Sequence, residues 1–169
     1  YTTLFRSERV FFQNRNDLEL FVRLGLVREG KTDRLPGSGV DLARFAPVES
    51  ANLSPDQPFQ TGEGGASRQE AFVFLLVARL LWDKGVGEYV EGARIVRQKY
   101  PAVEFRLLGF LDVQNPSAIP RAQVEAWVAE GVVHFMGSTD DVLPHLHEAD
   151  CVVLPSYREG CPRTLLEAA

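Results

Sequence analysis

Residues 71–78 form an unbroken apolar run of eight residues, AFVFLLVA. The run is too short to cross a membrane, for which a helix needs about 20 apolar residues. A strand with one solvent-exposed face alternates apolar and polar residues, whereas a strand covered on both faces of a parallel sheet is apolar throughout. The run therefore predicts a central strand of a parallel sheet.

The segments around this run alternate between short apolar stretches and amphipathic ones. Strands are expected at 9–13, 103–108, 132–136 and 151–154, and one further short strand is expected to end just before Pro36. Helices are expected from Asn16 onward, at 86–100, 121–130 and 142–149, and from Thr164 onward. Such alternation indicates βαβ units, and ligands of these sheets bind at the carboxyl ends of the strands. Residues 47–69, rich in proline and glycine, are expected to be a loop within a single domain.

Composition narrows the class of protein further. Hydrophobic residues make up 45% and charged residues 24% of the chain, which is typical of a globular domain. The net charge of −5 argues against a nucleic-acid-binding protein, which usually carries a basic domain. Two cysteines make no disulfide framework and fit a reducing cytosol, and the three histidines form no metal-binding set, so no metal site is expected.

Two cations flank the turn that follows the apolar run. Arg79 and Lys84 lie between the expected strand and the next helix. There they can converge on one anion at a helix N-terminus, and a diphosphate suits a guanidinium fork paired with a point charge. From position alone, two solvated surface cations are an equally good interpretation.

The loop after the last expected strand offers a second candidate site. Gly160 permits close approach of a ligand to the backbone, and the N–H groups from Cys161 to Thr164 could bind an anion. Glu159 and Glu167 could each accept two hydrogen bonds from a vicinal diol. Their spacing is weak support by itself, since a chain with this many glutamates is expected to contain one such pair by chance.

The segment 36–41, PGSGVD, is a third candidate, although a plain turn explains it equally well. It is not a dinucleotide fingerprint, because Leu42 stands where the third glycine would be required. A dehydrogenase is therefore disfavoured.

Together these segments resemble the donor-binding C-terminal half of family 4 glycosyltransferases, which have the two-domain GT-B architecture. The resemblance extends over residues 8–169 and is carried by 12–14 with 17–18, 37–41 with Phe45, Arg79, 84–85, Gly109, Gly137, 141–142, 149–160 and 165–168. Residues 109–112 with Asn115 and Pro116 resemble the capsular and O-antigen polysaccharide branch.

The resemblance implies an α/β fold with a Rossmann-like parallel sheet flanked by helices. It also implies a retaining transfer of a hexose or N-acetylhexosamine from a nucleotide-sugar, with no metal and no cofactor. The resemblance to the polysaccharide branch favours a UDP-linked donor. Arg79, Lys84 and Glu159 would be catalytic, and Glu167 would hold the ribose. The donor-binding residues implied are Gly39, Arg79, Lys84, Gly109, Glu159, Gly160, Cys161, Pro162, Arg163, Thr164, Leu165 and Glu167.

The chain departs from the family pattern in several ways. The acceptor half is absent, the donor domain of residues 8–169 stops before its last strands, and Cys161 replaces an aliphatic residue. Residues 1–7 match nothing and are expected to be a scar or disordered. We expect the fragment alone to be inactive, and the lipid-linked or glycan acceptor and any contact with the inner face of the membrane to involve the missing half. A cytoplasmic location follows from this interpretation.

Two alternatives stay open. Another GT-B enzyme, such as a sugar epimerase or phosphorylase, would share the fold and replace the residues at 79, 84 and 167. A non-catalytic, flavodoxin-like binding module would carry an acidic cluster, and not two cations, at the strand ends.

Overall fold

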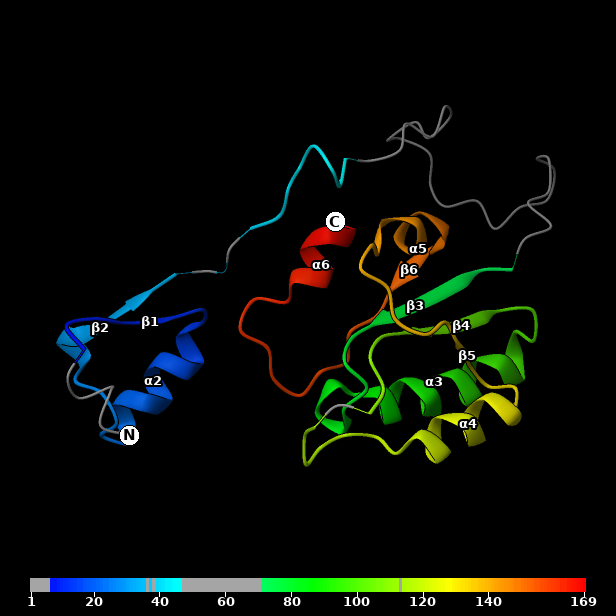
Figure 1. The fold of residues 1–169 in the computed structure, drawn as a ribbon, viewed down its shortest axis with the longest axis horizontal. Coiled ribbons are helices and arrows are strands. Elements are labelled where there is room, and N and C mark those ends of the chain that lie inside the picture. Colours follow the sequence, from blue (N-terminus) through cyan, green and yellow to red (C-terminus); the bar gives the residue numbers. More distant parts are fainter. Residues whose placement is uncertain (1–6, 36, 38, 47–70, 113) are drawn as a thin grey trace. The chain divides into compact units, whose positions relative to one another are not determined.

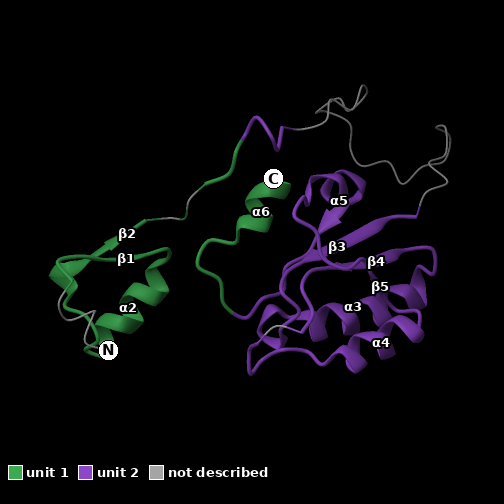
Figure 2. Cartoon of the chain, in the orientation of Figure 1, with its two compact units in different colours: residues 1–41, 158–169 green, residues 42–157 purple. Residues whose placement is uncertain are grey.

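The computed structural model describes residues 7–35, 37, 39–46, 71–112 and 114–169. The chain divides into two compact units, residues 42–157 and residues 1–41 with 158–169, which are coloured separately in Figure 2. The loop expected at 47–69 lies outside the described residues. The single-domain boundary at 8–169 stays a prediction.

The larger unit is built on a four-stranded parallel sheet with the strand order β5-β4-β3-β6. Its elements are β3 (Val73–Val77), η2 (Trp82–Lys84), α3 (Val86–Lys99), β4 (Glu104–Leu108), α4 (Arg121–Ala129), β5 (His134–Phe135), α5 (Leu143–Glu148) and β6 (Cys151–Val152). Figure 1 shows α3 and α4 on one face of this sheet and α5 on the other. That distribution follows from right-handed crossovers, because the chain moves across the sheet in one direction up to β5 and returns to reach β6.

The core explains why β3 has no polar residues. Leu76 of β3 and Leu107 of β4 pack with α3 and α4 in one buried cluster, and neither side chain is exposed. Leu75, the neighbour of Leu76, is also buried, although it points to the opposite face as strand geometry requires. Both faces of β3 are thus covered, as the apolar run predicts.

Local residues determine where helix α3 begins and ends. Gly85 has a φ of +70°, a left-handed conformation that glycine adopts without strain, and α3 begins at the next residue. Val86, Tyr89, Val90 and Ala93 are its buried residues, spaced as one helical face. Pro101 follows the last turn, where the residue before a proline disfavours helix.

The smaller unit contains a β-α-β segment and the last helix of the chain. Its elements are β1 (Val10–Phe12), α2 (Arg15–Arg23), η1 (Glu29–Lys31), β2 (Thr32–Arg34) and α6 (Arg163–Ala168). Strands β1 and β2 pair in parallel, with Val10 opposite Thr32. Phe12 packs edge-on against Phe21 of α2, with 5.2 Å between ring centroids.

The α/β fold class expected from the sequence is confirmed: parallel sheets are flanked by helices. The helices begin within two residues of their expected starts, but several strands are shorter than expected, with two residues each in β5 and β6. No helix among the described residues has the length and apolar character needed to span a membrane.

Candidate functional site

Arg79 and Lys84 stand at the carboxyl end of β3, as expected. Arg79 is exposed and Lys84, the last residue of η2, is half-buried. Gly85 follows, and a Cβ added to it would clash with the main-chain carbonyl of Pro155. The turn that carries the two cations therefore packs directly against the loop that follows β6.

A segment after β4 braces this turn from another direction. Trp82 N–H donates to the Ser117 carbonyl at 2.8 Å, and Asp83 N–H lies 3.3 Å from the Ser117 hydroxyl. That hydroxyl also donates to the Asp83 carboxylate. Leu81 forms an antiparallel bridge with Ala118, so residues 81–83 are tied to 117–118 along their whole length.

The loop after β6 completes the attachment of the turn. Tyr157 N–H donates to the Asp83 carbonyl at 3.1 Å, and the Tyr157 hydroxyl donates to Glu88 in the first turn of α3. That hydrogen bond lowers the pKa of Glu88. The neighbouring Ser156 hydroxyl is buried and has no hydrogen-bond partner among the described residues. Loops from three neighbouring strands, β3, β4 and β6, thus meet at Asp83.

Two of the three glycines named as donor-binding residues, Gly39 and Gly109, differ in their surroundings. Gly109, at the end of β4, approaches β3 so closely that a Cβ would clash with the carbonyl of Ala78. Its N–H donates to the Gly137 carbonyl at 2.8 Å. Gly39 has a φ of +74° and an open surface around it, in the smaller unit. Glycine is required at 109 by packing and is favoured at 39 by backbone conformation.

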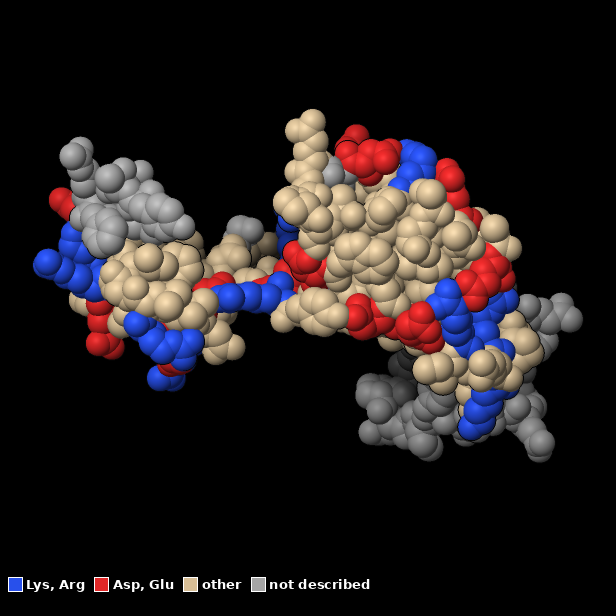
Figure 3. Space-filling model, turned by 90° about the horizontal axis from the view of Figure 1, so that it is seen from below, with Lys and Arg blue, Asp and Glu red and all other residues tan. Residues whose placement is uncertain are grey.

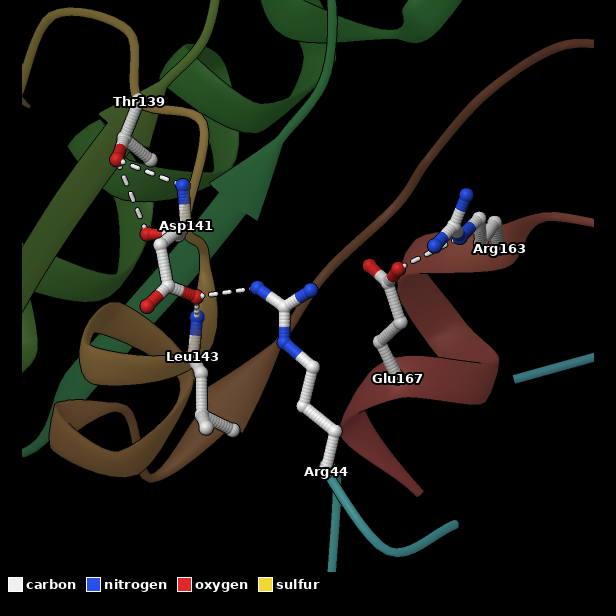
Figure 4. Close-up of polar contacts among 6 residues, drawn as sticks. All are labelled: Arg44, Thr139, Asp141, Leu143, Arg163 and Glu167. Atoms are coloured by element: carbon white, nitrogen blue, oxygen red, sulfur yellow. Dashed lines mark hydrogen bonds and ion pairs between the residues drawn. The ribbon is translucent and has the colours of Figure 1, made fainter. Parts of the chain in front are cut away.

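The remaining donor-binding candidates, residues 159–165 and 167, lie in and just before α6. Pro162 is the N-cap of this six-residue helix. Arg163 Nε donates to Glu167 Oε1 at 2.7 Å, one helical turn away, as Figure 4 shows. The Glu167 side chain is 11% exposed while that of Arg163 is 67% exposed, so the carboxylate is the anchored partner.

The predicted site residues therefore fall into two groups. Arg79, Lys84 and Gly109 lie in the larger unit, whereas Gly39 and the members from 159 onward lie in the smaller one. Within the larger unit the structure brings the cation turn together with Ser117 and Tyr157, which the sequence did not predict as partners. The convergence of the cations with the 160–164 backbone stays a prediction.

On the face drawn in Figure 3, acidic and basic side chains lie interspersed on both units. Arg44 pairs with Asp141 at 2.8 Å and lowers the pKa of that carboxyl, which also accepts the Leu143 N–H at the start of α5 (Figure 4). Among the described residues, no group of three or more His, Cys, Asp or Glu side chains could hold a metal ion.

Two relatives of this chain are named as glycosyltransferases. The chain is 32% identical over 162 residues to N,N'-diacetylbacillosaminyl-diphospho-undecaprenol alpha-1,3-N-acetylgalactosaminyltransferase of Campylobacter jejuni, covering 96% of this chain and 40% of that enzyme. It is 32% identical over 106 residues to the amylovoran biosynthesis glycosyltransferase AmsK of Erwinia amylovora, covering 56% of this chain and 24% of the relative. The chain thus spans less than half the length of either relative.

A solved structure shares the fold of this chain, and a family model shows its family. The crystal structure of Anabaena Alr3699/HepE in complex with UDP and glucose has a TM-score of 0.65 at 20% identity, covering 96% of this chain and 42% of that one. At that identity the likeness shows the fold. The family model described as "Glycosyl transferases group 1" matches residues 71–169, more than half of the chain. The chain belongs to the group 1 glycosyl transferases.

Proposed function

We propose that this chain is the donor-binding part of a retaining glycosyltransferase. The whole enzyme would transfer a hexose or N-acetylhexosamine from a UDP-sugar to a lipid-linked or glycan acceptor in surface polysaccharide synthesis. Membership of the group 1 family supports transfer over the epimerase, phosphorylase and flavodoxin-like alternatives. The names of the Campylobacter and Erwinia relatives support an N-acetylhexosamine and a polysaccharide product. UDP and glucose bound to the Anabaena protein support a UDP-linked donor.

The observation that carries this proposal is the braced cation turn after β3. Departure of a nucleoside diphosphate develops negative charge, and stabilising that charge is commonly the largest catalytic contribution. Cations serve this task best when they are held in place before the reaction. Ser117, Pro155 and Tyr157 fix the backbone of the turn that carries Arg79 and Lys84.

The carboxylates have separate proposed roles. Glu159 would contact the donor sugar, and the backbone from Gly160 to Leu165 would hold phosphate and sugar. Glu167 would accept hydrogen bonds from the ribose hydroxyls. Arg163 donates to one oxygen of Glu167, and the carboxylate keeps further acceptor positions for a diol.

No metal takes part in the proposed chemistry. Arg79 and Lys84 would neutralise the diphosphate as it leaves, the task that a divalent cation performs in other phosphate chemistry. Gly39 and Gly109 would allow the donor to approach the main chain. With a lipid-linked acceptor, the whole enzyme would work at the cytoplasmic face of the membrane.

Replacing Lys84 by alanine tests the central role in this proposal. In the two-domain enzyme, Lys84→Ala should lower kcat for UDP release about 100-fold, with a smaller change in KM, because a leaving-group cation acts mainly in the transition state. Lys99→Ala is the matched control, since Lys99 lies in the last turn of α3 and contacts the ring of Tyr100. Equal turnover in the two variants would contradict the proposal.

Direct binding tests the nucleotide. Calorimetric titration with UDP, GDP and a panel of their sugars should show binding of the UDP series and a weaker response to GDP. Preference for GDP would overturn the UDP assignment and leave the transferase proposal in place.

A further inference from the structure

The segment that precedes α6 is held by residues from the start of the chain. Asn14 Nδ2 donates to the Glu159 carbonyl at 3.1 Å, across 145 residues of sequence. Both segments belong to the smaller unit (Figure 2). Asn14 lies before residue 71, where the family match begins, whereas Glu159 lies within the match. The motif around Asn14, which the function proposed above leaves unused, thus touches a proposed catalytic residue.

The Asn14 side chain makes three hydrogen bonds at once. Its Oδ1 accepts the Asp17 N–H at 2.8 Å and so caps α2, and its Nδ2 donates to Asp17 Oδ2 at 3.0 Å as well as to Glu159. An amide offers one acceptor oxygen and two donor hydrogens, so both hydrogens are in use. The rotamer of Asn14 is therefore fixed by α2, and its second hydrogen is aimed at the Glu159 main chain.

An ion pair attaches the residue next to Glu159. Arg158 donates to Asp17 through Nε at 2.7 Å and again through Nη2 to the same oxygen. Hydrogen bonding from Arg158 lowers the pKa of Asp17, so this carboxylate is charged at neutral pH. Asn14, the N-cap of α2, and Asp17, in its first turn, thus hold two consecutive residues of the loop.

Packing extends this attachment to the next two residues. Gly160 lies against the Gln13 side chain, where an added Cβ would be 3.1 Å from the Gln13 Cβ. A Cβ added at Gly37 would be 2.9 Å from the Cys161 sulfur. Four consecutive residues, 158–161, are therefore each in contact with the segment 13–37. A six-residue helix such as α6 is too short to fix this loop by its own hydrogen bonds.

We propose that Asn14 is a positioning residue, which sets the Glu159 side chain by holding its main-chain carbonyl. The inference rests on the proposed function, which gives Glu159 the contact with the donor sugar. Asn14 touches no substrate in this scheme and acts only through Glu159. Displacement of a positioned group by about 1 Å can cost on the order of 100-fold in rate.

Asn14→Ser in the two-domain enzyme separates the two tasks of Asn14. Serine caps a helix as well as asparagine does, so α2 keeps its cap, but serine cannot reach and donate to Glu159. We expect kcat/KM for UDP release from UDP-N-acetylglucosamine and UDP-N-acetylgalactosamine to fall about tenfold or more, with little change in melting temperature. Asn14→Asp, which also caps α2 and lacks the donor, should show the same loss. Glu19→Gln is the control, since it removes only an exposed pair with Arg15 on the same helix.

A double variant distinguishes positioning from general support of the fold. If Asn14 acts through Glu159, Asn14→Ser should cost no further activity in a Glu159→Gln background, because the group it positions has been disabled. An equal loss in both backgrounds would overturn the inference, and so would Asn14→Ser and Asn14→Asp variants as active as Glu19→Gln. A Glu159→Gln variant as active as the wild type would instead overturn the proposed function.

Discussion

Tyr89 brings a hydroxyl group into the core of the larger unit, where only 3% of the residue is exposed. The oxygen lies 2.9 Å from the Phe74 carbonyl of β3 and 3.1 Å from the Arg106 carbonyl of β4, so it can donate to either strand. Burial raises the pKa of Tyr89, which keeps the proton that this donation requires. One α3 residue therefore links the two central strands through a polar contact inside an apolar cluster.

Replacing Tyr89 by phenylalanine should destabilise the fold by about 1 kcal/mol, the usual net value of a hydrogen bond, while ring packing is retained. Urea unfolding followed by circular dichroism measures the change. Tyr100→Phe is the control, because Tyr100 is exposed and its ring contact with Lys99 does not need the hydroxyl. Equal stability of the two variants would show that the buried carbonyls gain nothing from the Tyr89 donor.

The ion pair of Asp17 and Arg158 predicts that the folded state loses stability at acidic pH. The pKa of Asp17 is lowered below its ordinary value of 3.8, chiefly by the hydrogen bond from Arg158. A depressed carboxyl pKa stabilises the folded state at pH values above the unfolded pKa, and this contribution is lost as the pH falls through the folded pKa. The urea midpoint of the wild type should therefore fall more steeply below about pH 4 than that of Asp17→Asn. Parallel pH profiles of the two proteins would contradict this linkage.

The positions of residues near the ends of strands could be predicted from the sequence, but their hydrogen-bond partners could not. Arg79 and Lys84 could be placed at the carboxyl end of β3 because they directly follow a buried strand of a parallel sheet. The contact of Asn14 with Glu159 depends on two segments 145 residues apart, and no local pattern encodes it. Ser117 was not singled out in the sequence, and its hydrogen bond to Asp83 could be seen only in the folded chain.

At the scale of elements, hydrophobic periodicity predicted the bounds of the long helix α3 closely and those of short strands such as β6 less closely. Helix α3 was expected at 86–100 and ends at Lys99. Strand β6 was expected to have four residues and has two, because pairing with β3 is limited to Phe74 opposite Cys151 and Leu75 opposite Val152. The extent of a strand depends on its partner, which a pattern within one segment cannot reveal. The Asp141 carboxylate accepts the Leu143 N–H at the start of α5, although the cap position itself is Val142.

The junction of η2 and α3 predicts opposite effects for two glycines of nearby sequence. Gly85→Ala should destabilise the protein by about 1–2 kcal/mol or more, because a left-handed conformation is unfavourable for alanine and the new methyl group would meet the Pro155 carbonyl. Gly92→Ala should stabilise it by about 0.5–1 kcal/mol, because Gly92 lies inside α3 with nothing within 4 Å of an added Cβ. Thermal or urea unfolding of both variants gives the comparison. A neutral Gly85→Ala would show that the turn is free to move away from the β6 loop.

At the scale of the whole molecule, the chain alone should bind a nucleoside diphosphate weakly and transfer no sugar. Transfer requires donor and acceptor to be held together in a site that excludes water. The proposed roles of the residues described above are contacts to anions and diols, and none of them is an evident base for an acceptor hydroxyl.

The assay for this expectation is UDP release from a UDP-sugar panel by the purified 169-residue chain, with and without glycan acceptors. Calorimetry on the same sample reports binding, which Glu167→Ala should abolish. Leu165 and Leu166 of α6 are 39% and 38% exposed, and an apolar dye should bind this surface. Robust transfer by the chain would place the acceptor site within these residues and contradict the division of labour proposed above.

The strand order β5-β4-β3-β6 also has a consequence for how the protein is made. Strand β3 lies between β4 and β6, and the Asp150 carboxylate beside β6 accepts the Val73 N–H from 77 residues away. On the ribosome, one edge of this wholly apolar strand therefore stays unpaired while the next helices and strands emerge. An unpaired apolar edge is a template for aggregation. Yield in the cell should depend on how quickly the segment from Cys151 onward leaves the exit tunnel and closes that edge.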